Sequence, residues 1–328
     1  MSQPLLEVRH LATEFITEQG VARALDDISF HINAGETLGI VGESGCGKSV
    51  TALSILRLLP KPAGNIVSGE VLLQGKDLTR LVPEQMHHIR GNRIAMIFQE
   101  PMTALNPVYR VERQLGETLA LHNPQMSKVE IRAASIKMLQ RVGIPAPERR
   151  MQEYPHQLSG GMRQRVMIAI ALLCEPEILI ADEPTTALDV TIQAQTLQLL
   201  KDLQQETGMA IIFITHDLGV IAELCDRVLV MYSGRIIEQA EIHALFDTPL
   251  HPYTRGLLNA IPRMEKPAKQ SLSTIPGMVP SLFELPSGCR FQNRCEYVQE
   301  PCRTQTPPLE GESDEHQVRC FRYRELMH

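Results

Sequence analysis

The chain lacks any apolar run long enough to cross a membrane, which takes roughly 18 residues. The run VMIAIALLC at 166–174 is about half that length. The N-terminus MSQPLLEVRH has no basic segment followed by an apolar one, so we expect no secretory signal. Basic residues are not in excess either, and a formal net charge of −6 argues against a nucleic-acid-binding protein. We therefore expect a cytosolic protein without a nucleic-acid partner.

Cysteine is scarce over most of the chain, because only three of its seven cysteines precede position 289. The remaining four, Cys289, Cys295, Cys302 and Cys320, are separated by five, six and seventeen residues. Such a set forms disulfides, binds a metal or fills a core. Cytosolic thiols are normally kept reduced, so a cytosolic location argues against a stable disulfide framework. A metal site and a set of core residues remain.

The 328 residues, 43% of them hydrophobic, suffice for one large domain with a smaller appendage, or for two ordinary domains. Strands and helices alternate in the pattern of a mainly parallel sheet flanked by helices. We expect strands at 5–15, 24–32, 35–41, 93–99, 177–182, 210–215 and 227–232. We expect one helix from Lys48 to about Leu59, ended by Pro60 and Pro62, and another at 128–142. After about Ala260 the sequence is rich in proline and weakly periodic.

The segment GESGCGKS fits the P-loop pattern of a glycine, four residues and Gly-Lys-Ser. Its glycines allow backbone N–H groups to surround a phosphate, and the helix that follows presents its positive N-terminal end. Lys48 is suited to bind the β- and γ-phosphates, and Ser49 to bind magnesium. The alternative, a glycine-rich turn with a surface lysine, is disfavoured by the strand before and the helix after. The candidate nucleotide-binding residues here are Gly42, Ser44, Gly45, Cys46, Gly47, Lys48 and Ser49.

Cys46 is the one thiol in this loop. Because no base partner is visible for it in the sequence, we interpret it as a small residue that fills the loop rather than as a catalytic thiol.

A second motif, ILIADEP at 178–184, is an apolar strand that delivers Asp182 and Glu183 at its carboxyl end. Ligands of parallel sheets bind at this end of the strands. Asp182 is suited to hold magnesium through water, and Glu183 to accept a proton from an attacking water molecule. The alternative is that the two acids only cap the helix that follows.

A third motif, LSGGMRQR at 158–165, places a serine and two glycines at the start of an expected helix, where N–H groups and a hydroxyl can bind phosphate. By itself it is equally an ordinary capped helix. In order with the other two motifs, it resembles the signature sequence of ATP-binding cassette (ABC) ATPases. Gln99 in IFQEP resembles the Q-loop, TALD at 186–189 the D-loop, and His216 in FITHD the switch histidine. The resemblance covers roughly residues 5 to 260.

This resemblance implies a role for each matching residue. Glu183 and His216 would be catalytic: Glu183 would polarise the attacking water, and His216 would contact the γ-phosphate and position that water. Gln99 would bind the magnesium ion, sense the nucleotide and relay its state to a membrane partner. ATP would bridge two cassettes and pull them together, and its hydrolysis would release them.

Other residues would serve that dimer. Ser159, Gly160 and Gly161 would contact ATP bound to the opposite subunit, and Asp189 would lie near the dimer seam. Phe15 is the candidate for stacking on the adenine ring, with a core aromatic residue as the alternative.

Four further segments resemble the dipeptide/oligopeptide importer ATPases of bacteria: FQEPMTALNPVYRV (98–111), ADEPTTALDVTIQAQ (181–195), HPYTRGLL (251–258) and IPGMVPSLFELPSGCRFQNRC (275–295). This resemblance implies a second related ATPase as heterodimer partner, two transmembrane permease subunits and an extracytoplasmic solute-binding protein. The chain would bind peripherally to the cytoplasmic face of the inner membrane. Peptides are the first candidate cargo, and nickel chelates, glutathione or opines are the alternatives.

The rival class consists of ABC ATPases that act in DNA repair and translation. They usually have two fused cassettes or a long coiled coil, and the segment 100–155 is too short for one. We therefore expect an α/β P-loop fold of the ABC ATPase type, with an antiparallel β subdomain, a helical subdomain at about 101–165 and a small irregular C-terminal extension. The cassette would span 1–262 and the extension 263–328. His251, which begins HPYT, is interpreted as shaping a turn before a short helix rather than as a metal ligand.

The four late cysteines are better interpreted as metal ligands in such a protein. Structural zinc sites favour close C-x₂₋₄-C pairs, and none occurs among them. Their wider spacing is compatible with a Cys₄ [4Fe–4S] cluster, which resembles what the C-terminal region of some peptide-importer ATPases carries. A Zn²⁺ site, or no metal, is the alternative. A metal would order a segment that has many prolines and few large apolar residues.

Overall fold

The computed structural model describes residues 3–99, 104–185, 189–261, 274–313 and 315–326. The chain divides into two compact units. The first consists of Met1–Ile32, Thr37–Thr79 and Thr215–His328, and the second of Asn33–Glu36 and Arg80–Ile214. Across the described ranges, no helix is both long and apolar enough to span a membrane.

One sheet of the first unit is antiparallel, with its strands in the order β2-β1-β4-β5. The strands are β1 Leu6–Thr17, β2 Gly20–Ile32, β4 Gly64–Leu73 and β5 Lys76–Asp77. Along β1 the side chains of Leu6, Val8 and Leu11 are buried, while Arg9 is exposed. This sheet confirms the two predicted strands at 5–15 and 24–32, and adds β4 and β5, which the sequence analysis missed.

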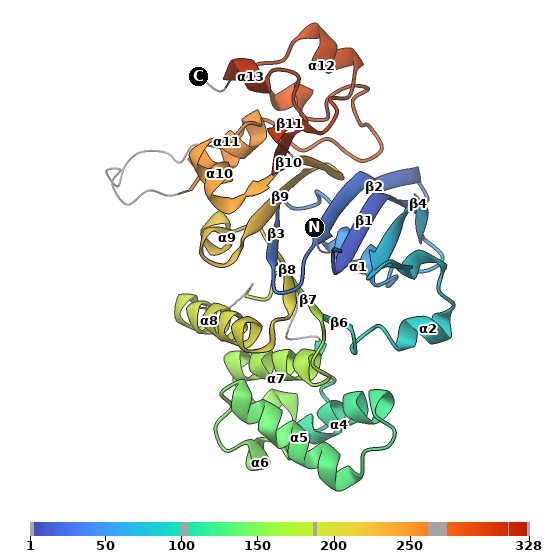
Figure 1. The fold of residues 1–328 in the computed structure, drawn as a ribbon, viewed down its shortest axis with the longest axis vertical. Helices are drawn as coiled ribbons and strands as arrows, with labels where there is room; N and C mark the ends of the chain where they lie inside the picture. Colours follow the sequence, from blue (N-terminus) through green and yellow to red (C-terminus); the bar gives the residue numbers. More distant parts are fainter. Residues whose placement is uncertain (1–2, 100–103, 186–188, 262–273, 314, 327–328) are drawn as a thin grey trace. The chain divides into compact units, whose positions relative to one another are not determined.

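The other sheet of the first unit runs in the order β11-β12-β10-β9-β3, of which Figure 1 labels β11, β10, β9 and β3. Its strands are β3 Thr37–Val41, β9 Arg227–Tyr232, β10 Arg235–Glu241, β11 Glu310–Ser313 and β12 His316–Val318. β3 and β9 are parallel, and the other neighbours are antiparallel. The C-terminal strand β12 pairs with β10, with Glu238 opposite Val318. The C-terminal residues therefore extend this sheet, which the sequence analysis did not predict.

The first helix of this unit, α1 (Lys48–Ile55), begins at the predicted residue but ends before the predicted Leu59. Arg57 adopts the left-handed conformation with φ 53, and the N–H of Leu58 donates to the carbonyl of Leu53 at 2.8 Å. This is a Schellman turn, and it ends the helix before the prolines are reached. The remaining helices are α9 Leu218–Leu224, α10 Ile242–Asp247, α11 Pro252–Asn259, α12 Glu300–Thr304 and α13 Tyr323–Leu326, with a 3₁₀ turn at Gln292–Arg294.

The second unit is built on three parallel strands in the order β8-β7-β6. They are β6 Ile94–Ile97, β7 Ile178–Asp182 and β8 Ala210–Thr215. All residues of β7 and β8 are buried. Such continuous apolar strands are typical of a parallel sheet covered on both faces. The predicted strands at 93–99, 177–182 and 210–215 are confirmed to within a few residues.

The helices of the second unit include the predicted one at 128–142, observed as α5 Lys128–Arg141. Its start is fixed by a capping box, in which Ser127 accepts from the N–H of Glu130 and the Glu130 carboxylate accepts from the N–H of Ser127. The others are α2 Pro83–His87, α4 Val111–His122, α6 Pro147–Arg150, α7 Gly160–Leu172 and α8 Val190–Thr207. One 3₁₀ turn of this unit lies at Pro155–Gln157, and another, Leu78–Arg80, lies where the chain passes from the first unit to the second.

Candidate functional site

The predicted phosphate-binding loop lies between β3 and α1 in the first unit. Gly45 and Gly47 have φ values of 78 and 106, in the region that favours glycine. Gly42 has no room for a side chain, because a Cβ there would lie 2.3 Å from the carbonyl oxygen of Met231. The loop therefore requires its glycines for both backbone conformation and packing, as expected for a backbone cradle around phosphate.

Lys48 is the first residue of α1 and is 6% exposed. Its ammonium donates to the carbonyl oxygens of Gly42 at 2.8 Å and Glu43 at 3.2 Å, so it lies across the loop. Ser49 follows in the first turn of the helix. Cys46 is buried, and burial raises the pKa of its thiol, which fits the interpretation as a loop filler.

The predicted acidic pair lies at the carboxyl end of β7 in the second unit. Asp182 is the last residue of the strand and is 3% exposed. Glu183 has φ 46, an uncommon conformation for a residue with a side chain, and its N–H donates to the carbonyl of Ile214 at 2.9 Å. Such strain is concentrated at functional sites. Gln99 follows the end of β6, and its Nε2 lies 3.3 Å from Oε2 of Glu183, so these two predicted residues are brought together.

The signature segment also lies in the second unit. Ser159 is the N-cap of α7, and its hydroxyl accepts from the N–H of Met162 at 3.3 Å. Ser159 and Gly160 are exposed. Asp189 is exposed and caps α8 by accepting from the N–H of Ile192 at 2.9 Å. The other three TALD residues, 186–188, lie outside the described residues, as do 100–103 of the Q-loop segment.

Two more predicted residues, His216 and Phe15, belong to the first unit. His216 is exposed and directly follows β8, before the N-cap Asp217 of α9. Phe15 is half-buried on β1, opposite Gly64 of β4, where a Cβ would lie 3.0 Å from its ring. Its role in adenine stacking stays a prediction.

The HPYT segment makes a contact to the phosphate-binding loop that was not predicted from the sequence. His251 is the N-cap of α11 and accepts from the N–H of Tyr253, which confirms the predicted turn before a short helix. The hydroxyl oxygen of Tyr253 accepts a hydrogen bond from the loop N–H of Glu43 at 2.8 Å. The resemblance of HPYTRGLL to importer ATPases marked this segment, but nothing in the sequence indicated that it reaches the loop.

The four late cysteines are neighbours in the first unit. Burial raises the pKa of Cys289 to about 12, and nearby Cys302, Cys320 and Cys295 add to the rise. Cys320 is raised to about 11 by burial, with Cys295 and Cys302 adding to it. The N–H of Cys289 also donates to the carbonyl of Cys302 at 2.8 Å. Cys289 and Cys302 are therefore neighbours in space, and the thiols of the set act on one another electrostatically although they are spread over 289–320.

A metal site at these cysteines is nevertheless not shown. Within the described part of the chain, no three histidine, cysteine, aspartate or glutamate side chains form a group that could hold a metal ion. The seven cysteines form no disulfides with one another in the structure.

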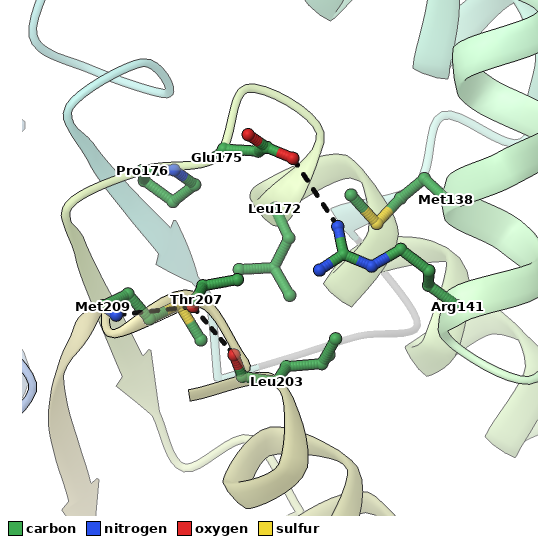
Figure 2. Close-up of a pocket in the computed structure, with 8 residues that line it drawn as sticks. All are labelled: Met138, Arg141, Leu172, Glu175, Pro176, Leu203, Thr207 and Met209. Carbon is green, nitrogen blue, oxygen red and sulfur yellow. Dashed lines mark hydrogen bonds and ion pairs between the residues drawn. The ribbon is translucent and has the colours of Figure 1, made fainter. Parts of the chain in front are cut away.

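A pocket in the second unit contains none of the predicted site residues (Figure 2). It is lined by Met138, Arg141, Leu172, Glu175, Pro176, Leu203, Thr207 and Met209. Arg141 and Glu175 approach to 3.7 Å, and the hydroxyl of Thr207 donates to the carbonyl of Leu203 at 2.7 Å. Because the remaining lining is mostly apolar, we interpret the pocket as a packing gap between α5, α7 and α8.

Comparison with protein families gives two matches. Residues 25–186 match the family described as "ABC transporter", and residues 237–302 match "Oligopeptide/dipeptide transporter, C-terminal region". The second match includes HPYT and three of the four late cysteines.

Relatives match over nearly the whole chain. The "Probable peptide ABC transporter ATP-binding protein y4tR" of Sinorhizobium fredii is 54% identical, covering 98% of this chain and 96% of the relative. The "Oligopeptide transport ATP-binding protein AppD" of Bacillus subtilis is 51% identical over 98% of this chain and 97% of its own length. The "Dipeptide transport ATP-binding protein DppD" of Bacillus subtilis is 50% identical over 97% and 95%.

Solved structures match the fold. The dimeric structure of MJ0796, "a Bacterial ABC Transporter Cassette", has a TM-score of 0.65 and 29% identity, covering 72% of this chain and 98% of the other. A second structure of MJ0796, a post-hydrolysis state bound to ADP and Pi, has a TM-score of 0.65 and 28% identity over the same shares of both chains.

Proposed function

We propose that this chain, which belongs to the ABC transporter ATP-binding proteins, hydrolyses ATP to drive the import of di- and oligopeptides. Membership of that family makes the chain an ATPase with a P-loop fold. One observation supports peptides as the cargo: relatives named for peptide transport are 50% to 54% identical to this chain over nearly its whole length.

The residues divide the work of hydrolysis in the following way. Backbone N–H groups of the loop from Gly42 to Ser49 bind the phosphates, and Lys48 neutralises their charge. As the family motifs imply, Ser49, Asp182 and Gln99 would hold Mg²⁺, which would supply positive charge to the phosphates. The glycine cradle and the inward-directed ammonium of Lys48 fit a phosphate ligand.

Glu183 accepts a proton from the attacking water. Its left-handed backbone and its contact with Gln99 support this role, because both fix the position of the carboxylate. His216 contacts the γ-phosphate and positions that water, and Phe15 stacks on the adenine ring. These assignments extend to this chain the roles that the family motifs imply.

Coupling to transport requires a second cassette. Ser159, Gly160 and Gly161 contact ATP on the partner, and Asp189 lies at the seam. ATP bound between two cassettes favours the closed dimer, and loss of the γ-phosphate favours opening. The exposure of Ser159 and Gly160 supports this role, as does the dimeric structure of the similar cassette MJ0796.

The partners follow from the same assignment. We propose a second, related ATPase subunit, two transmembrane permease subunits and an extracytoplasmic solute-binding protein, with this chain on the cytoplasmic face of the inner membrane. We also propose that the cassette ends near residue 262 and that 263–328 form a C-terminal extension.

Uptake by cells that express the complete transporter tests the cargo. Labelled di- and tripeptides, nickel chelate and glutathione would be offered separately to cells with and without this subunit. We expect loss of peptide uptake alone when the subunit is missing. Loss of nickel-chelate or glutathione uptake with intact peptide uptake would reject peptide as the cargo.

We further propose that Cys289, Cys295, Cys302 and Cys320 bind a [4Fe–4S] cluster. Four neighbouring thiolates need positive charge to ionise together, because their mutual repulsion and burial raise the pKa. Structural zinc sites favour close C-x₂₋₄-C pairs, and none occurs among these four cysteines, which favours a cluster over zinc.

Purification without oxygen tests the cluster. The protein is expected to be brown with four irons per chain, and Cys295→Ser should remove the colour. Cys225→Ser is the matched control, since Cys225 is a buried thiol outside the set. Colourless protein with one zinc per chain would replace the cluster by zinc, and metal-free protein would reject both.

A further inference from the structure

Glu43, the second residue of the phosphate-binding loop, is held from several directions within the first unit. Its N–H donates to the hydroxyl of Tyr253 at 2.8 Å, and its carbonyl accepts from Lys48 at 3.2 Å. Its carboxylate accepts two hydrogen bonds from Arg294, Nη1 to Oε2 at 2.6 Å and Nη2 to Oε1 at 3.1 Å. This is a bidentate ion pair, the arrangement that fixes both partners best.

Arg294 comes from the C-terminal part of the chain and is itself fixed. Its side chain is only 3% exposed. Its Nε donates to the carbonyl of Pro276 at 2.9 Å, and its Nη2 also donates to the carbonyl of Ile275 at 3.2 Å. The guanidinium lies over the rings of Tyr232 and Phe291, at 5.8 and 5.9 Å from their centroids. A buried, fully engaged guanidinium of this kind has one orientation available to it.

The charge of Glu43 explains why such a partner is useful. A loop that binds a polyanion carries here a carboxylate of its own, which repels phosphate unless it is neutralised. Arg294 neutralises that carboxylate through the bidentate pair. The carbonyl of Glu43 also accepts a hydrogen bond from Lys48. By holding Glu43, Arg294 therefore fixes one acceptor of the Lys48 ammonium as well.

We propose that Arg294 is a positioning residue for nucleotide binding, which holds and neutralises Glu43 so that the loop accepts the phosphates of ATP. The inference rests on the proposed ATPase function and adds a residue outside the ABC motifs to its binding site. Arg294 acts through Glu43 and is not a catalytic residue.

The simpler alternative is that Arg294 only anchors the C-terminal extension. Arg290 offers a matched control for that alternative. It is also a nearly buried arginine next to a cysteine of the set, with 9% of its side chain exposed. It pairs with Asp26 of β2 and donates to the carbonyl of Ser233, and among the described residues it makes no hydrogen bond or ion pair with the loop. Removing Arg290 therefore weakens the anchoring without exposing Glu43.

Equilibrium binding of a fluorescent ATP analogue to the full chain tests the proposal. We expect Arg294→Gln to raise the Kd about five- to tenfold, and Arg290→Gln to change it less than about twofold. In the double variant Glu43→Gln/Arg294→Gln, most of the lost affinity should return, because the unpaired carboxylate is gone. Thermal unfolding of each variant checks that it folds, and Arg294→Lys, which keeps the charge but not the fork, should give an intermediate Kd.

The outcomes separate the alternatives. Equal losses of affinity in Arg294→Gln and Arg290→Gln, or no recovery in the double variant, would show an anchor and overturn the proposal. If the wild-type chain binds ATP and the Arg294→Gln variant binds it equally well, this inference alone is overturned. A folded wild-type chain that binds no ATP would overturn the proposed function together with it.

Discussion

The loop from Gly42 to Ser49 and the acidic strand end at Asp182 and Glu183, which serve one reaction in the proposed function, are held in different ways. Asp182 ends a strand whose residues are all buried, so hydrophobic packing of β7 determines where the acids lie. Glu43 in the loop is held by polar contacts from Tyr253 and Arg294, 210 and 251 residues further along the chain. The position of the acidic strand end therefore depends on hydrophobic packing, and the position of the loop depends on specific polar partners.

The largest effect is expected at the acidic end itself. Glu183→Gln should lower ATP turnover about 10²–10⁴-fold, because the amide cannot accept a proton from water. ATP binding should remain, since Glu183 is assigned to the chemical step. Turnover of the reconstituted transporter measures this, with Glu206→Gln on an exposed position of α8 as control. Near-wild-type turnover in Glu183→Gln would remove it from the catalytic role.

Packing beneath the acidic pair can be tested on β7. Ile180 is 0% exposed, so Ile180→Ala should lower the free energy of unfolding by about 2–5 kcal/mol. Val190, at 82% exposure, is the control, and Val190→Ala should change stability little, because alanine favours a helix. Urea unfolding followed in both variants gives the answer. Similar losses at the two positions would contradict the dependence of the acidic end on burial.

Lowering the pH should reduce the folding stability of the first unit through His251. Burial lowers the pKa of His251 from 6.5 to about 4, opposed by the nearby Glu238 carboxylate. The unfolded chain therefore binds this proton near pH 6.5 and the folded chain only near pH 4. Between these values stability falls as the pH drops, by up to about 3 kcal/mol, and above pH 6.5 this group adds no pH dependence.

His251→Asn tests that effect, because asparagine also caps a helix but does not titrate. Urea unfolding at pH 7.5 and pH 5 should show a smaller loss on acidification in the variant than in the wild type. An unchanged loss would mean that His251 does not carry the pH dependence.

The smallest effect on stability is expected when Arg290, a polar anchor of the C-terminal segment, is replaced. Arg290→Gln should cost about 1–2 kcal/mol of stability, because Asp26 keeps its contact with Arg235 at 2.6 Å. Limited proteolysis of the C-terminal segment and thermal unfolding measure this loss. A loss as large as that of Ile180→Ala would indicate that polar contacts hold this unit as strongly as burial holds β7.

The sequence predicted what local patterns determine. The strands at 178–182 and 210–215 were recognisable because parallel strands covered on both faces are continuous apolar runs. The helix from Lys128 was predicted by its periodicity, and a capping box fixes its start. The spacing of the glycines with Lys48 and Ser49 likewise predicted a glycine-rich loop before a helix. Its glycines adopt positive φ values in the structure.

Other features leave no such pattern. β11 and β12 have four and three residues, too few for a periodicity to be recognised. The early end of α1 depends on the left-handed backbone of Arg57, a residue type that does not signal that conformation. The pairing of Glu43 with Arg294 spans 251 residues, and a single sequence carries no signal for a contact at that distance.

ATP hydrolysis by the reconstituted transporter, with and without peptide-loaded binding protein, tests the central claim most directly. Loaded binding protein is expected to stimulate hydrolysis, and Lys48→Ala in this subunit is expected to remove the stimulated rate, because Lys48 is assigned to the phosphates. Stimulation that is unaffected by Lys48→Ala, or a complete transporter that hydrolyses ATP without any response to peptide, would contradict it.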